Sequence, residues 1–333
     1  MSPCKSLYAL LALLSLPCLP HVAASSSRSQ CSANAYVHHF NLNNISGIIT
    51  SDGPIRQSQN FFSVPDAAVT LSYSFLFRST SPIVWQQNIL LIDLPNIGRV
   101  LVDTGLNARV PNPLFAGTGL LMRNLRAIHV SPDSIDVVLL THGHPDHVAG
   151  LVDDDGNRVF RHATVYVGEI EHDFWTADPF INPSSRVPNA TLENISGIYR
   201  RSLSAYEPDV VLVANATSPL PGVTFLLYPG HTPGHSVIQI DVGGDRKLMC
   251  VGDAWFSQPD QVRNPEWVRP VETDGLQGFQ SRVALMRNLS NSADLVLAYH
   301  EEFPGLGHIV RSTSGFDWVA AVDRNHDVVR SQC

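Results

Sequence analysis

A short stretch near the middle of the chain places four metal-ligand side chains within six residues. Residues 141–147 read Thr-His-Gly-His-Pro-Asp-His. In an extended turn, His142 and His144 point the same way, and Asp146 and His147 are left to serve a neighbouring position. Imidazole and carboxylate ligands together suit Zn²⁺ and similar divalent metals. Four residues cannot complete two coordination shells, so the remaining ligands must come from elsewhere in the chain.

Three further candidate ligands follow downstream, each just after an apolar run that reads as a strand. They are His231, Asp253 and His300. His308 is the alternative to His300, but we expect it in a glycine-flanked loop, whereas His300 ends an apolar strand. We therefore favour His300 as the last ligand and give His308 a structural or pocket role.

The elements that must position these residues are short strands and helices that interleave in two runs. Apolar alternation or continuous apolar runs predict strands at 69–77, 83–94, 99–105, 135–140, 163–167, 210–213, 223–227, 237–242, 247–251 and 294–299. Helical spacing predicts helices at 119–129, 169–176, 199–206 and 278–289, and a helix that begins within 148–152. This order predicts an α/β fold, two sheets covered by helices, with the chemistry on loops at one edge.

The beginning of the chain has the pattern of a targeting signal. Lys5 supplies a positive charge, residues 7–16 are apolar, and residues 22–24 (Val-Ala-Ala) supply a cleavage site. The apolar run is too short to span a bilayer comfortably. We predict that residues 1–24 are a signal peptide and that residues 25–333 form one secreted domain without stable membrane anchoring.

Secretion changes how the cysteines and sequons are interpreted. Cys250 lies in an apolar run and is expected to be a buried free thiol. Cys31 and Cys333 lie near opposite ends of the mature chain, and chain termini often lie close together, so we predict a disulfide between them. Asn-x-Ser/Thr sequons predict glycosylation at Asn44, Asn189, Asn194, Asn215 and Asn288.

Composition limits the kind of partner. The chain has 333 residues, 44% of them hydrophobic, and a formal net charge of −8. This content allows a large core, and the acidic balance argues against nucleic acid or an anionic membrane as the main partner. We expect a small substrate that is neutral or apolar. The oligomeric state is left open, with a homodimer among the options.

Five motifs in this order resemble the metallo-β-lactamase-fold hydrolase superfamily over about residues 72–310. They are Val-Asp-Thr-Gly at 102–105, the stretch 141–147, Pro-Gly-His-Thr-Pro-Gly-His at 229–235, Gly-Asp at 252–253, and His300. Within the superfamily the chain looks most like the methyl parathion hydrolase branch. That narrower similarity depends on Asp-Phe-Trp at 173–175 and on Phe-Pro-Gly-Leu-Gly-His at 303–308.

The resemblance implies an αββα sandwich of two mixed sheets flanked by helices, with a two-metal centre. It assigns His142, His144 and His231 to the first metal and Asp146, His147 and His300 to the second, with Asp253 bridging them. It places Asp103 and His235 in supporting hydrogen bonds. It makes Phe174, Trp175 and Phe256 candidates for a substrate wall.

The implied activity is hydrolysis of an ester, lactone or organophosphate bond. Two divalent metals, with Zn²⁺ favoured, can hold a bridging hydroxide at neutral pH. Asp146 would then be both a ligand and a proton shuttle. Lactonases of this fold commonly have a tyrosine three residues after the bridging aspartate, and here that residue is Phe256. The alternatives are a lactonase or secondary-metabolite hydrolase in a biosynthetic or detoxification pathway, and a non-catalytic metal-binding protein.

Overall fold

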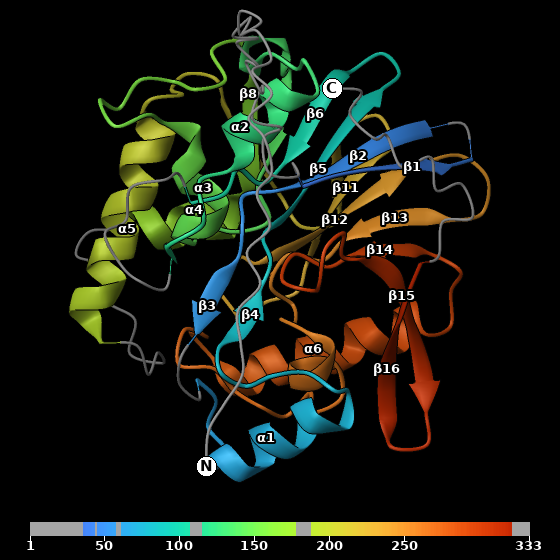
Figure 1. The fold of residues 1–333 in the computed structure, drawn as a ribbon. Helices are drawn as coiled ribbons and strands as arrows, with labels where there is room; N and C mark the ends of the chain where they lie inside the picture. Colours follow the sequence, from blue (N-terminus) through green and yellow to red (C-terminus); the bar gives the residue numbers. More distant parts are fainter. Residues whose placement is uncertain (1–35, 44, 58–60, 107–114, 178–187, 322–333) are drawn as a thin grey trace, which may run out of the picture. The chain divides into compact units, whose positions relative to one another are not determined.

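The computed structural model describes residues 36–43, 45–57, 61–106, 115–177 and 188–321. In these residues two seven-stranded sheets pack against each other, and helices cover their outer faces (Figure 1). Each sheet contains both parallel and antiparallel pairs. The predicted α/β sandwich of two mixed sheets flanked by helices is confirmed.

The first sheet is antiparallel at one edge and parallel from β6 onward. Its strands in spatial order are β1 (Val37–Leu42), β2 (Ile45–Ser51), β5 (Asn88–Leu94), β6 (Gly98–Val102), β7 (Val137–Leu139), β8 (Thr164–Gly168) and β9 (Val210–Val213). Parallel strands bring their carboxyl ends to one edge of a sheet, and β6 and β7 therefore deliver their following loops to the same place.

The second sheet is antiparallel except for the pair β13–β14. Its strands in spatial order are β10 (Thr217–Leu220), β11 (Val223–Leu227), β12 (Ser236–Asp241), β13 (Lys247–Cys250), β14 (Leu295–Leu297), β15 (Leu306–Ser312) and β16 (Gly315–Ala320). The carboxyl ends of β11, β13 and β14 lie at the same edge, because each runs antiparallel to a shared neighbour or parallel to the next strand.

The helices lie on the two outer faces of the sandwich, except the first, which packs against residues 258–262. They are α1 (Asp66–Phe75), α2 (Leu121–Ala127), α3 (Pro145–Val148), α4 (Glu169–Thr176), α5 (Asn189–Ser204) and α6 (Gly275–Leu289). Single turns occur at η2 (Pro132–Ser134), η3 (Ala149–Leu151) and the π-helix η4 (Gln258–Val262). A small hairpin, β3 (Ile55–Gln57) with β4 (Ile83–Trp85), lies close to α1 in Figure 1.

Alternation along the strands explains why there are four layers. In β5, Ile89 and Leu91 pack into the cluster with α2, α4 and α5, whereas Leu90 and Ile92 pack between the sheets. Successive side chains of a strand point to opposite faces, so a strand buried on both faces reads as a continuous apolar run. On the far side of the second sheet, Met286 and other residues of α6 close the last layer.

The predicted strand at 69–77 is wrong, because this segment belongs to helix α1. Val69 and Tyr73 are buried, whereas Leu71, Phe75 and Phe77 are 72%, 65% and 100% exposed. Burial four residues apart is the period of a helix, and the alternating apolar residues gave a misleading signal. The predicted strand at 83–94 is two strands, β4 and β5, in different sheets.

The folded region extends beyond the core expected at residues 72–310. β1 and β2 precede it, β16 follows it, and the hairpin β15–β16 was not foreseen. Cys250 is a buried free thiol in β13, as predicted. The proposed signal peptide, Cys31, Cys333 and Asn44 lie outside the described residues. No helix in the described part of the chain is long and apolar enough to cross a membrane.

Candidate metal centre

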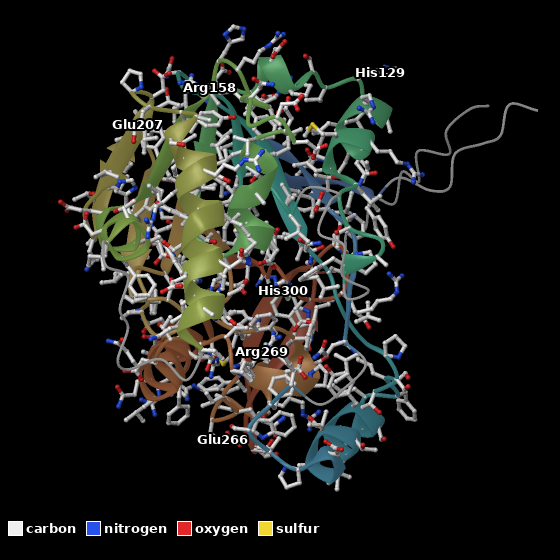
Figure 2. All side chains as sticks on the ribbon, turned by 90° about the vertical axis from the view of Figure 1, so that its left-hand side faces the viewer. His129, Arg158, Glu207, Glu266, Arg269 and His300 are labelled. Carbon is white, nitrogen blue, oxygen red and sulfur yellow. The ribbon has the colours of Figure 1, made fainter. Side chains whose placement is uncertain are left out.

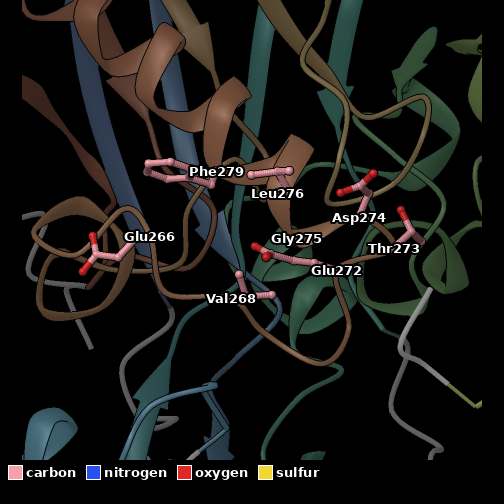
Figure 3. Close-up of a pocket in the computed structure, with 8 residues that line it drawn as sticks. All are labelled: Glu266, Val268, Glu272, Thr273, Asp274, Gly275, Leu276 and Phe279. Atoms are coloured by element: carbon pink, nitrogen blue, oxygen red, sulfur yellow. The ribbon is translucent and has the colours of Figure 1, made fainter. Parts of the chain in front are cut away.

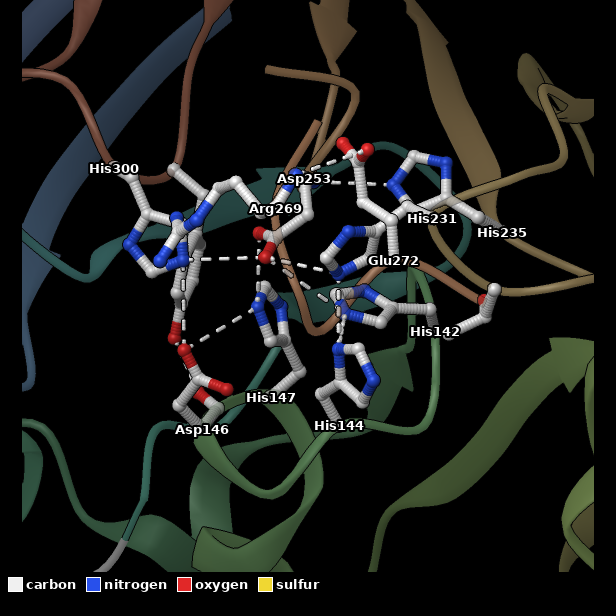
Figure 4. A network of polar contacts seen from close by, with 12 residues as sticks. His142, His144, Asp146, His147, His231, His235, Asp253, Arg269, Glu272 and His300 are labelled. Carbon is white, nitrogen blue, oxygen red and sulfur yellow. Dashed lines mark hydrogen bonds and ion pairs between the residues drawn. The ribbon is translucent and has the colours of Figure 1, made fainter. Parts of the chain in front are cut away.

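The candidate ligands collect at one edge of the sandwich because each follows the carboxyl end of a strand. His142 comes three residues after β7, and His144, Asp146 and His147 lie at the start of α3 or within it. From the second sheet, three loops contribute one ligand each: the loop after β11 provides His231, the loop after β13 provides Asp253, and the loop after β14 provides His300. Figure 4 shows these side chains converging.

One group of four side chains has the geometry of a metal site. The Nδ1 atom of His144 lies 3.1 Å from Nε2 of His142 and 2.9 Å from Nε2 of His231. A carboxylate oxygen of Asp253 lies 3.2 Å from Nε2 of His231. The residues His142, His144, His231 and Asp253 are all buried.

A second group adjoins the first and shares Asp253 with it. Asp146, His147 and His300 form this group, in which Nε2 of His147 and Nε2 of His300 lie 3.7 and 3.5 Å from Oδ2 of Asp146. Oδ1 of Asp253 lies 3.1 Å from Nε2 of His147, and Oδ2 lies 3.2 Å from Nε2 of His300. The carboxylate of Asp253 thus reaches both groups, which is the position expected of a bridging ligand.

The protonation of the histidines leaves lone pairs directed inward. Burial lowers the pKa of His142 and of His144 well below the usual value, so both are neutral. Nδ1 of His142 lies 3.1 Å from Thr141 Oγ1, whose own proton goes to Asp103. Nδ1 of His142 therefore carries the proton, and its Nε2 presents a lone pair to the cluster.

Asp103 orients His147, one of the two buried histidines of the second group. Its Oδ2 atom accepts a hydrogen bond from Nδ1 of His147 at 2.8 Å, which turns Nε2 of His147 toward Asp253. The backbone of Thr141 donates to Oδ1 of Asp103 at 2.9 Å. Asp103 has a φ of +63°, a conformation that Asp tolerates better than most residues. Asp103 thus holds His147 through a hydrogen bond to its outer ring nitrogen, as residues that orient metal ligands do.

Three carboxylates give the second group a strongly negative field. Burial lowers the pKa of His147, but Asp253, Asp103 and Asp146 outweigh burial and raise the pKa well above its usual value. Burial raises the pKa of Asp253, but the neighbouring histidines, above all His300, hold it well below the usual range. The group therefore favours a cation at its centre.

His235 supports Asp253 through the backbone. Its Nε2 atom accepts a hydrogen bond from the Asp253 amide at 3.0 Å, and its Nδ1 atom lies 3.2 Å from the carbonyl oxygen of Tyr228. Burial lowers the pKa of His235 to about 3, so the ring is neutral and can accept this bond. His235 lies beside the cluster and holds the loop that carries the shared carboxylate.

Glu171 of α4 is an important residue that the sequence did not reveal. Its Oε1 atom accepts hydrogen bonds from the Gly143 amide at 2.7 Å and from Trp175 Nε1 at 2.6 Å. Its Oε2 atom accepts from Thr232 Oγ1 at 2.6 Å and from the Gly234 amide at 3.0 Å. Glu171 thus connects the loop of His142 and His144 to the loop of His231. No sequence signal marks it, because it is an ordinary acidic residue in the first turn of a helix.

The predicted position of His308 needs correction. His308 lies in β15 rather than in a loop, and its Nδ1 atom lies 2.9 Å from the carbonyl oxygen of Asp294. Asp294 precedes β14, whereas His300 follows it, so His308 lies at the opposite end of that strand from the cluster. Antiparallel pairing of β14 with β15 places it there.

The predicted aromatic wall is part of the core. Trp175 is 0% exposed and lies behind His144, with ring centroids 5.7 Å apart, and a Cβ on Gly143 would overlap it. Phe174 packs against the same core cluster. Phe256 is buried and stacks on the imidazole of His300. Trp175 and Phe256 are closed off from solvent, whereas Phe174 is partly buried.

A pocket of about 330 Å³ lies beside the loop of His231, at the N-terminus of α6 (Figure 3). Val268, Leu276 and Phe279 form its apolar wall, and the rest of the lining is mostly acidic. Thr273, which also lines it, donates its amide hydrogen to the carbonyl oxygen of His231 at 2.9 Å. None of the cluster residues lines this pocket, so it is separate from the metal centre.

A family model for the metallo-beta-lactamase superfamily matches residues 82–298, which include six of the seven cluster residues, and His300 follows two residues after the matched range. This chain belongs to the metallo-beta-lactamase superfamily. A probable metallo-hydrolase of Mycobacterium tuberculosis is 23% identical over 262 residues, covering 68% of this chain and 77% of the relative. An N-acyl homoserine lactonase of Bacillus sp. is 25% identical over 191 residues, covering 50% and 67%.

Solved structures share the fold over nearly their whole length. AidC, a dizinc quorum-quenching lactonase solved with a product, superposes with a TM-score of 0.80 and 28% identity, covering 87% of this chain and 99% of AidC. The hydrolase AbOPH of the beta-lactamase superfamily superposes with a TM-score of 0.79 and 22% identity, covering 88% and 100%. The chain is therefore a metallo-hydrolase-type member of the superfamily with a His/Asp metal site.

The residues present fit a pair of divalent metals. Nitrogen lone pairs that face each other at 2.9–3.1 Å repel unless a cation lies between them. Tetrahedral zinc with bonds of 2.0–2.1 Å separates its nitrogen ligands by about 3.3 Å, close to the spacing found here. Nε2 of His147 and Oδ1 of Asp253 are buried without hydrogen-bond partners, although they lie 3.1 Å apart. A metal ion would satisfy both atoms.

Proposed function

We propose that the protein is a binuclear metal-dependent hydrolase that cleaves an ester, lactone or organophosphate bond. The observation that carries the proposal is the position of Asp253, whose carboxylate oxygens reach ligand groups on both sides. A shared carboxylate holds two cations at a short separation, as two-metal hydrolytic centres require. The likeness to a dizinc lactonase supports two metals, and zinc is the metal we expect.

The proposed ligand sets follow the two groups. His142, His144 and His231 would hold the first metal, and Asp146, His147 and His300 the second, with Asp253 shared. When bound, such a pair of metals polarises the oxygen of the scissile group and lowers the pKa of water.

Asp146 is the chain's candidate for proton transfer. Its side chain is 17% exposed, whereas that of Asp253 is 3% exposed, so Asp146 faces the accessible side of the cluster. The hydroxyl of Tyr299 donates to the backbone carbonyl oxygen of Asp146 at 2.5 Å and holds this turn in place. We infer that Asp146 is both a metal ligand and the group that carries a proton to the leaving oxygen.

The substrate is expected to be small and neutral or apolar. Phe256 stands where a tyrosine would supply a phenol in many lactonases of this fold, and its ring lies flat against His300 at an interplanar angle of 7°. This favours substrates that need no phenol, such as activated esters and phosphotriesters. The Asp-Phe-Trp segment at 173–175 is the basis for proposing the methyl parathion hydrolase-like branch.

Turnover by metal-reconstituted protein tests the proposed function. The chelated and the reconstituted protein would be compared on aryl esters, lactones and phosphotriesters. Hydrolysis that depends on metal and saturates near two ions per chain is the expected result. Two bound ions with no hydrolysis of any class would instead favour a non-catalytic metal-binding protein. Lactone hydrolysis alone would favour the lactonase alternative, including a role in secondary metabolism or detoxification.

We also propose that the protein is secreted and glycosylated. The four sequon asparagines in the described residues are all exposed, as glycosylation requires: Asn189, Asn194, Asn215 and Asn288. Expression in a eukaryotic host should release protein that begins near Ser25 and loses mass on deglycosylation. Retention of residues 1–24 on the purified protein would contradict cleavage.

A further inference from the structure

Arg269 is a buried cation that leaves two of its three guanidinium nitrogens without a hydrogen-bond partner. Its side chain is 4% exposed, and its Nε and Nη1 atoms are buried without a hydrogen-bond partner. Burial lowers the pKa of Arg269 to about 10, with carboxylates opposing this effect, so the guanidinium stays charged at neutral pH. A buried charge is costly unless something compensates for it. Nearby carboxylates offset part of this cost, and the flat face of the guanidinium makes further contacts with aromatic rings.

Aromatic rings surround the guanidinium group. Its central carbon lies 3.3 Å from the ring centroid of Phe256 and 4.1 Å from that of Trp85. Phe61 and Phe62 lie at 5.2 and 5.6 Å. Arginine stacks on aromatic faces through its flat, weakly hydrated cation, and lysine cannot reproduce that contact.

The ring of Phe256 also contacts the metal centre. It stacks on the imidazole of His300 with centroids 4.3 Å apart and planes within 7° of parallel. At these distances, Arg269 and His300 would overlap if both lay on the same face of Phe256. They therefore lie on opposite faces, and the three flat groups form one stack. Figure 2 shows His300 and Arg269 near each other in the interior.

The segment Trp85-Gln86 fixes both ends of this stack. Trp85 Nε1 donates to Oδ2 of Asp260 at 2.8 Å, and Asp260 lies in the π-helix η4. π-Helical turns occur frequently at functional sites. The carbonyl oxygen of Gln86 lies 2.7 Å from Nδ1 of His300, which turns Nε2 of His300 toward the cluster. The hydrogen bond sets the tautomer of His300, and the stack sets the plane of its ring.

We propose that Arg269 is a positioning residue for the second metal: its guanidinium holds Phe256 flat against His300 and so fixes the plane of that ligand. This inference rests on the proposed two-metal centre. It assigns no contact between Arg269 and the substrate. The flat shape of the guanidinium positions the ring of Phe256, because the Nε and Nη1 atoms of Arg269 make no hydrogen bond that could do so.

Metal titration of three variants tests the proposal. Arg269→Lys keeps the positive charge but removes the planar guanidinium, and Arg269→Met removes both the charge and the planar group. Arg263→Lys is the matched control, because Arg263 stacks on Phe75 at 4.2 Å and Phe75 belongs to α1, which contributes no ligand. Apo-protein would be titrated with Zn²⁺ by calorimetry, and bound metal counted by mass spectrometry. The thermal midpoint of each metal-free variant would report whether it folds.

We expect both Arg269 variants to weaken the second metal by about 10- to 100-fold, as for other residues that orient metal ligands. The affinity for the first metal should stay within about threefold, because Phe256 stacks on His300 at 4.3 Å but lies tilted and 5.9 Å away from His231. Arg263→Lys should keep both affinities within about threefold, because its ring partner Phe75 belongs to α1, which contributes no ligand. Unchanged second-metal affinity in Arg269→Lys, or equal weakening of both metals, would overturn the proposal. If wild type binds fewer than two metals, the proposed function fails instead.

Phe256→Leu keeps the proposal testable if the Arg269 variants do not fold. It removes the flat ring from the middle of the stack and leaves Arg269 in place. The same selective loss of the second metal is expected. Full occupancy by two metals with wild-type affinities in this variant would likewise overturn the role of the stack.

Discussion

Replacing Glu171 with glutamine removes one acceptor oxygen from the junction between the two loops that carry the first-metal histidines. All four partners of this carboxylate donate hydrogen bonds to it. Burial raises its pKa, but a group surrounded only by donors favours the ionised form. A glutamine must therefore place its amide group against donors at one of the two oxygen positions.

The geometry determines which position the amide takes. At the Oε1 position, the amide would face Gly143 and Trp175, two N–H groups that cannot accept a hydrogen bond. At the Oε2 position, it would face the hydroxyl of Thr232, which can rotate to accept, and the Gly234 amide, which cannot. The second orientation is better and leaves one buried N–H without a partner.

The expected cost follows from this count. An unsatisfied buried donor costs about 1–3 kcal/mol, and the remaining bonds lose the strength that the charge gave them. We expect the free energy of unfolding to fall by about 2–4 kcal/mol. Because the lost bonds hold the loop of His231, the first metal should weaken more than the second. This selectivity is the reverse of that expected for Arg269.

Urea unfolding of the metal-free protein and zinc titration of the folded protein measure the two effects. Glu169→Gln is the matched control, because Glu169 lies in the same helix and is exposed. It should leave both quantities unchanged. If Glu171→Gln matched this control in stability and in first-metal affinity, the connecting role of Glu171 would be refuted.

Three further predictions concern catalysis, pH and metal removal. Asp146→Asn should lose at least about 100-fold in turnover while keeping part of its metal, because it removes the proton carrier; turnover near wild type would exclude this role. Burial raises the pKa of Asp52 from 3.8 to about 6, so the native state holds this proton more tightly than the unfolded state. Stability from this group should fall by up to about 3 kcal/mol as pH rises from about 4 to 6, and urea unfolding of Asp52→Asn should lack that slope. Chelation should lower the thermal midpoint and zinc should restore it, since ions at 100 times their Kd add about 2.7 kcal/mol; an unchanged midpoint would argue against tightly bound metal.

Local patterns in the sequence predicted several parts of the fold well. The strands that precede the ligands are apolar runs that end abruptly at polar turns, and β7 and β13 were found for this reason. The helix α6 was found from its apolar spacing, although it begins at Gly275 rather than Gly278. Local patterns failed in α1, where alternating apolar residues lie in a helix with one buried face.

The metal ligands could be recognised in the sequence because histidine and aspartate seldom occur together at ligand spacing by chance. His142 to His147 lie within six residues, so no tertiary information is needed to see them as a unit. The aromatic residues were harder to assign. In the sequence, Trp175 is equally compatible with a pocket and with a core, and only its burial in the folded chain decided for the core.

The sequence by itself determined the family, the ligand types and the strands that deliver them, because motifs and hydrophobic periods are local properties. The tertiary structure alone decided what holds those ligands in place. Glu171 lies 28 residues from Gly143 and 63 from Gly234. The stack of Arg269, Phe256 and His300 joins three separate loops. Contacts of this kind depend on how distant segments pack, and the side chains that make them have no spacing that distinguishes them along the chain.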